Sequence, residues 1–144
     1  MARETKPGKR RSIAVDLDGT LAHYEHFEGP AKIGAPIPEM VEKVKQALDQ
    51  GDEVTIFTAR VNANSGNYKD ALDATIAYVA IADWCTSVFG HILPITHEKS
   101  REFTDFWDDR AEGVVKNTGV FKTELMEALG ADRAGELTAP AREN

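Results

Sequence analysis

Short apolar runs alternate with segments of helical periodicity along the first part of the chain. Residues 12–17 (SIAVDL) and 53–59 (EVTIFTA) are β-branched and apolar, as is typical of strands buried on both faces. Between them, residues 37–51 repeat an apolar side chain every three or four positions, with a proline in the first turn and a glycine at the stop. The pattern predicts a strand, a helix and a second strand.

The alternation continues towards the C-terminus. Residues 68–85 have the periodicity of a second helix, and two short apolar runs that could be strands follow it at 91–96 and 103–107. Two last elements are expected beyond them: a short edge strand within 112–118 and a helix over 119–130 that ends at Gly130.

This order of elements predicts an α/β fold. Right-handed crossovers between successive strands give a three-layer, Rossmann-like and mostly parallel sheet with helices on both faces. Residues 21–37 have room for a one-turn helix and a small flap, so no separate cap domain is expected. We expect one domain over residues 12–130, a disordered basic arm at 1–11 and a disordered tail at 131–144.

Composition and charge narrow the class of protein. The 144 residues are 42% hydrophobic and 28% charged, enough for one globular core, and no apolar run approaches the ~18 residues of a membrane span. A single cysteine, Cys85, cannot form an internal disulfide, so a cytoplasmic protein without a membrane partner is expected. The net charge is −7 although residues 1–11 carry +4, so the body is acidic and stable nucleic-acid binding is not expected. The sequence does not indicate an oligomeric state.

Polar side chains gather where the predicted strands end. In parallel sheets, ligands bind beyond the carboxyl ends of the strands. The residues at these ends are Asp16 and Asp18, then Thr58 and Arg60, then Lys99, and finally Asp108 with Asp109. Four carboxylates in one crevice need a counter-charge, and oxygen ligands suit Mg²⁺ better than zinc. A hydroxyl and a lysine beside them match a phosphoryl group.

The same residues carry a family resemblance. The succession DLDGT, IFTAR, THEKS and FWDDRA, over residues 12 to about 111, resembles the four ordered motifs of the haloacid dehalogenase superfamily of phosphotransferases. More narrowly, the chain is similar to small capless members of bacteria and phages for which no substrate is settled. The resemblance implies a Mg²⁺-dependent phosphatase.

The resemblance also implies roles for single residues. Asp16 is the expected nucleophile and forms an aspartyl-phosphate, and Asp18 is the expected general acid and base, with a backbone carbonyl on the metal. Thr58 and Lys99 hold the phosphoryl oxygens, although Arg101 could take the place of Lys99. An acid at position 18 favours a phosphatase over a dehalogenase, because a halide leaves without a proton.

The remaining expected site residues hold metal or substrate. Asp108 is the expected direct Mg²⁺ ligand, and Asp109 coordinates either directly or through water. Gly19, Thr20 and Arg60 are expected to bind the substrate, although Arg60 could equally pair with an aspartate. The substrate is a phosphorylated small molecule or a phosphorylated nucleic-acid end.

Two other classes of protein share parts of this pattern. A signalling receiver domain has an acidic Mg²⁺ pocket, a threonine and a lysine, but its phosphoryl acceptor follows the third strand rather than the first. An inactive phosphate-binding module would keep the pocket without turnover. The order of the motifs and the full set of acids favour the phosphatase over both.

Overall fold

The chain divides into two compact units, Met1–Asp109 and Arg110–Asn144. The computed structural model describes residues 10–133, so the N-terminal arm up to residue 9 and the tail from residue 134 lie outside the described residues. The boundary after Asp109 falls inside the range expected to form one domain.

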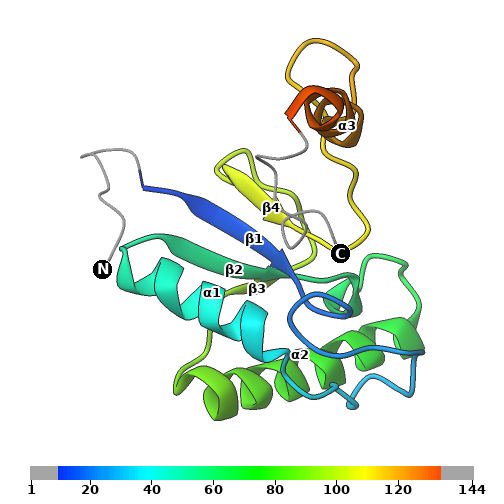
Figure 1. Ribbon diagram of the computed structural model, residues 1–144. Coiled ribbons are helices and arrows are strands. Elements are labelled where there is room, and N and C mark those ends of the chain that lie inside the picture. Colours follow the sequence, from blue (N-terminus) through cyan, green and yellow to red (C-terminus); the bar gives the residue numbers. More distant parts are fainter. Residues whose placement is uncertain (1–9, 134–144) are drawn as a thin grey trace. The chain divides into compact units, whose positions relative to one another are not determined.

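The first unit is built on a four-stranded parallel sheet (Figure 1). Its strands are β1 (Ser12–Asp16), β2 (Glu53–Phe57), β3 (Ile95–Thr96) and β4 (Asp105–Trp107), in the order β3-β2-β1-β4. All three neighbouring pairs are parallel, which confirms the predicted α/β class. β1 and β2 are the two inner strands of the sheet, and β1 has the longer run of buried residues.

Two helices pack on one face of this sheet (Figure 1). They are α1 (Pro38–Asp49) and α2 (Tyr68–Phe89), and a short 3-10 turn, η1 (Ala59–Val61), follows β2. The core joins the strands to both helices, and it contains Ile13, Val15, Leu17, Val54 and Ile56 from β1, β2 and the turn after β1, with Val41, Val44, Ala47, Ile81 and Cys85 from the helices. Cys85 is fully buried, and burial raises the pKa of its thiol, as suits a structural cysteine.

The strand order explains why both helices lie on the same face. The chain moves from β1 to β2 to β3 in one direction across the sheet, and right-handed crossovers in one direction place their helices on one side. The return from β3 to β4 spans residues 97–104 without a helix. Helices on both faces are therefore not confirmed within residues 10–109, where the structure also has no separate cap domain.

The opposite face of the sheet carries an aromatic group instead. Phe57, Phe103 and Phe106 meet edge to face, with ring centroids 5.8–6.3 Å apart. Phe106 pairs in register with Ala14, so this face is the one on which even-numbered residues of β1 lie. The loop between β3 and β4 thus covers part of this face with Phe103.

Two of the expected strands need correction. The strand expected at 91–96 is reduced to Ile95–Thr96, because Pro94 has no N–H to donate to a ladder. The edge strand expected at 112–118 is absent from the described residues. Its place is taken by one bridge between Val114 and Phe121, because Asn117 and Gly119 adopt positive φ and turn the chain.

The last helix, α3, belongs to the second unit and runs from Lys122 to Arg133. It begins three residues later than expected and continues past Gly130. That glycine was expected to end the helix, but it is helical rather than left-handed.

Among the described residues, one helix is long and apolar enough to cross a membrane, namely α2, with a mean hydropathy of 1.2. Length and composition alone also admit the core helix of a soluble protein. One side of α2 packs on the sheet through Ala74, Ala77, Ile81 and Cys85, as such a helix does.

Candidate active site

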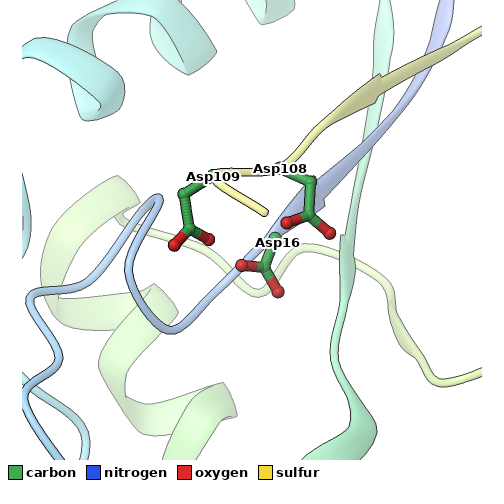
Figure 2. Close-up of side chains that lie close together, drawn as sticks. All are labelled: Asp16, Asp108 and Asp109. Carbon is green, nitrogen blue, oxygen red and sulfur yellow. The ribbon is translucent and has the colours of Figure 1, made fainter. Parts of the chain in front are cut away.

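The register of two neighbouring strands brings the first acids together. Val15 of β1 pairs with Trp107 of β4, so the residues that follow, Asp16 and Asp108, leave the sheet side by side. Figure 2 shows Asp16 at the end of β1, with Asp108 and Asp109 on the chain that leaves β4. Residues more than 90 positions apart in sequence thus share one edge of the sheet.

The three carboxylates form a candidate cation site. One oxygen from each of Asp16, Asp108 and Asp109 lies within 4.8 Å of the others (Figure 2). Burial, followed by the charge of Asp108, raises the pKa of the Asp16 carboxyl from 3.8 to about 7. Burial and the neighbouring carboxylates therefore disfavour the ionised form of Asp16, which a bound cation would favour, and the all-oxygen donor set of the cluster fits Mg²⁺.

Thr20 links two of these acids. Its hydroxyl oxygen lies 3.2 Å from Oδ2 of Asp16 and 3.0 Å from Oδ1 of Asp109, and it accepts a hydrogen bond from the backbone N–H of Asp109 at 2.9 Å. The hydroxyl has one hydrogen and donates it to one carboxylate at a time. Thr20 is only 7% exposed, so water does not replace these contacts easily. Thr20 therefore orients the acidic cluster, and its expected contact with the substrate stays a prediction.

Gly19 is required by the same close packing. Its φ is +90°, and a Cβ at this position would lie 2.8 Å from Oδ2 of Asp109. The backbone around it folds tightly, since the N–H groups of Thr20, Leu21 and Ala22 all donate to the carbonyl of Leu17. This turn is what carries Thr20 back between the carboxylates.

Asp18 is held by Arg60. The guanidinium Nε lies 2.7 Å from Oδ2 of Asp18 and Nη2 lies 3.1 Å from Oδ1, so the contact is bidentate. The Arg60 side chain is only 8% exposed. The sequence left two roles open for Arg60, namely substrate binding and pairing with an aspartate. In the structure Arg60 pairs with Asp18. The carboxylate of Asp18 does not belong to the three-acid cluster.

Arg60 also contacts the loop that follows the turn after β1. Its Nη1 donates to the carbonyl of Gly29 at 3.2 Å, and its Cζ lies 5.2 Å from the centre of the Phe27 ring. The loop, residues 23–35, is closed at its base by a bridge between Ala22 and Pro36. It contains no helix, contrary to the one-turn helix expected there.

A cavity of about 300 Å³ lies beneath this loop and reaches Arg60. Two histidines on its wall are paired with glutamates, His23 with Glu25 at 2.9 Å and His26 with Glu28 at 3.3 Å. Lys32 also lines it. A group bound here would sit next to the side chain that holds Asp18.

The two other expected phosphoryl-binding residues lie in different settings. Thr58 is buried directly after β2, and its hydroxyl accepts from the N–H of Arg60 at 3.2 Å. Lys99 lies over the opposite sheet face, with Nζ 5.3 Å from the centre of the Phe106 ring. Phe106 precedes Asp108 by two residues on one side of β4, so Lys99 is on the side to which Asp108 belongs.

In residues 10–109, the structure gives Lys99 no contact with Asp16, and Arg101 is exposed. The roles of Lys99 and Arg101 stay predictions. Two contacts were missed from sequence, namely the hydroxyl of Thr20 between the acids and the ring of Phe27 against Arg60. The spacing of Thr20, four residues after Asp16 in a Gly-Thr turn, is the signal that could have found the first.

Comparisons with known proteins do not indicate a function for this chain. No family model and no curated protein matches the chain. One solved structure that it resembles is a conserved protein from Bacteroides thetaiotaomicron, with 20% sequence identity and a TM-score of 0.49 over 94% of this chain and 98% of that chain. This likeness carries no argument about activity.

Proposed function

We propose that this protein is a Mg²⁺-dependent phosphatase of the haloacid dehalogenase type that hydrolyses a phosphate monoester through an aspartyl-phosphate. The observation that carries the proposal is the convergence of Asp16, Asp108 and Asp109 at the carboxyl ends of β1 and β4. The order of the sequence motifs adds to it, because Asp16 belongs to the first and the acid pair to the last.

In the proposed first step, an oxygen of Asp16 attacks the phosphorus of the ester. The bond from phosphorus to the ester oxygen breaks, and the leaving oxygen takes a proton from Asp18. For this attack the Asp16 carboxyl must be ionised, whereas burial and the charge of Asp108 raise the pKa of Asp16 to about 7. A cation held by the three acids would supply the compensating positive charge and help to stabilise the transferring phosphoryl group.

In the proposed second step, Asp18 takes a proton from water while the water oxygen attacks the phosphorus of the aspartyl-phosphate. The acyl-phosphate bond breaks, inorganic phosphate leaves, and Asp16 is a free carboxylate again. Asp18 needs a fixed position to act on both the leaving group and the water. The bidentate contact from Arg60 supports this requirement in the second step, in which Asp18 starts as a carboxylate.

The cavity under residues 23–35 is the proposed place for the leaving group. It adjoins Arg60, and its volume of about 300 Å³ admits a small organic group rather than a folded partner. Thr58 and either Lys99 or Arg101 are the proposed donors to the phosphoryl oxygens. We also propose a cytoplasmic location, on the grounds of the single buried thiol of Cys85.

The test is hydrolysis of p-nitrophenyl phosphate by the purified full chain. Turnover is expected with Mg²⁺ and is expected to stop with a chelator and in Asp16→Asn. Asp18→Asn should still bind orthovanadate, a phosphate analogue, while turnover stops. The matched control is Asp49→Asn, which removes an exposed carboxylate at the end of α1 and should leave the rate unchanged.

The same experiment separates the other classes of protein. A long-lived acyl-phosphate without release of phosphate would favour the receiver, and phosphate binding without any ester hydrolysis would favour the inactive module. Phosphorylated metabolites and oligonucleotides with 5′ or 3′ phosphates would then be compared to identify the substrate class.

A further inference from the structure

Helix α2 has a second apolar face, on the side opposite its buried residues. Tyr68, Leu72, Ile76 and Val79 are spaced four, four and three residues apart, so they form one stripe. All four are exposed, including Leu72 at 46% and Val79 at 55%. The buried residues Ala74, Ala77, Ile81 and Cys85 lie on the other side of the helix. An apolar stripe of this length on a surface marks an interaction site.

The stripe borders a shallow groove. A cavity of about 550 Å³ is lined by Ile76, Val79 and Ala80 of α2, together with Ala31 of the 23–35 loop. Only 22% of the most apolar 18-residue window of α2 is buried. Because residues on one helix face recur every three or four positions, the shape that fits such a groove is another helix with the same stripe.

Two opposite charges on the same side of α2 lie at equal distances from Ile76 along the helix. Lys69 and Asp83 lie seven residues before and seven residues after Ile76. Seven residues are close to two helical turns, so both side chains point within about 20° of Ile76 and lie about 21 Å apart along the helix. Asp83 has no ion pair among the residues that the structure describes, and Lys69 is paired only with Asp73, at 2.8 Å on the helix surface.

We propose that this stripe binds a second copy of the chain, with the two α2 helices antiparallel about a two-fold axis near Ile76. In that arrangement each Lys69 faces Asp83 of the other copy, and the apolar side chains between them pack together. A parallel pairing would instead place Lys69 against Lys69 and Asp83 against Asp83. The charges therefore select both the occupant and its direction. This inference does not rest on the proposed phosphatase activity.

The first test is charge reversal, read by sedimentation equilibrium of the full chain over a range of concentrations. Asp83→Lys and Lys69→Asp should each weaken dimerisation by about tenfold or more, because the symmetry repeats each repulsion twice. The two changes combined in one chain should restore it. Glu42→Lys, an equal charge change on the exposed side of α1, is the control and should have no effect. A dimer indifferent to both single changes, or a protein monomeric at every concentration, overturns the proposal.

The second test is cross-linking at the axis. Ile76→Cys should form a disulfide between two copies on mild oxidation, and the natural Cys85 contributes no background because it is buried. Thr86→Cys is the control, since it lies ten residues from the axis and its copies would be about 30 Å apart. Equal cross-linking of both variants would contradict the two-fold axis. Flotation of the monomer with phosphatidylcholine and phosphatidylglycerol vesicles would assign the stripe to lipid and also overturn the proposal.

Discussion

Arg60 holds the carboxylate of Asp18 through two nitrogen atoms, at 2.7 and 3.1 Å, and the same guanidinium reaches the carbonyl of Gly29. The Arg60 side chain thus connects the turn after β1 with the 23–35 loop, which lines the neighbouring cavity. Planar, two-point contacts of this kind restrict the orientation of a carboxylate more than a single charge does. Arg60 therefore both positions Asp18, the proposed general acid and base, and lines the cavity proposed for the leaving group.

The first prediction concerns this support. Arg60→Lys keeps the positive charge but cannot make the two-point contact with the Asp18 carboxylate, so we expect kcat to fall about 10- to 100-fold. In a double-mutant cycle with Asp18→Glu, which keeps a carboxylate, the two losses should not add, because both act on one carboxylate. Steady-state kinetics on p-nitrophenyl phosphate measure the effect, and additive losses would show that Arg60 acts elsewhere.

A matched control exists at the other end of the sheet. Arg11 contacts Asp52 with Nε at 3.0 Å and Nη2 at 2.9 Å, and the Asp52 side chain is fully buried. Arg11→Lys should therefore lower the free energy of unfolding by about 1–2 kcal/mol without changing kcat. A comparable loss of kcat in both variants would point to general destabilisation instead.

The second prediction concerns Thr20. Thr20→Val removes the hydroxyl between Asp16 and Asp109 and leaves the Asp109 N–H without its acceptor. The Mg²⁺ concentration for half-maximal activity should rise about 10- to 100-fold, while Thr20→Ser should stay near the natural protein. Titration of activity against Mg²⁺ measures this. An unchanged Mg²⁺ requirement in Thr20→Val would mean that the hydroxyl does not orient the acids.

The third prediction follows from the raised pKa of Asp16, about 7 against 3.8 for a free aspartate. The folded protein binds this proton more tightly than the unfolded chain, so ionisation disfavours folding. Without Mg²⁺, the stabilising contribution is present below pH 3.8 and is lost as the pH rises through about 7. Asp16→Asn should therefore stabilise the metal-free protein by about 1–2 kcal/mol at pH 8, after allowance for solvent screening, and much less at pH 4.

Urea unfolding at several pH values, with a chelator present, provides the measurement. Addition of Mg²⁺ at pH 8 should stabilise the natural protein more than Asp16→Asn, because binding to the folded state alone raises stability. Equal unfolding midpoints of the two proteins at pH 8 without Mg²⁺ would contradict the charge imbalance at Asp16.

The fourth prediction decides between Lys99 and Arg101 as the basic donor to the phosphoryl group. Lys99 and Arg101 are both exposed residues of the same loop, but Lys99 lies over Phe106, on the side of the sheet to which Asp108 belongs. Lys99→Ala should lower kcat about 10²- to 10³-fold, as is usual for the loss of one donor to a developing charge. Arg101→Ala should change it less than threefold, and the reverse result would transfer the role to Arg101.

The sequence by itself determined the parallel strands and the acids at their ends. Alternation of β-branched runs with helical periodicity is a local property, and the period of two along a strand sets which side chains share a face. For that reason the sequence places Asp16, Asp108 and Asp109 at one edge of the sheet, where the three carboxylates lie together. The hydrophobic pattern did not predict that β3 is short or that α3 continues through Gly130. Both depend on the backbone conformation of single residues, which the pattern does not specify.

Only the tertiary structure decided how the side chains around those acids are used. The place of the Thr20 hydroxyl between two carboxylates depends on a turn in which Leu17 accepts three backbone hydrogen bonds. Likewise, the pairing of Arg60 with Asp18 and the outward apolar stripe of α2 arise from contacts between segments distant in sequence. Periodicity predicts which face of an element is apolar, but long-range packing decides which of two apolar faces is covered.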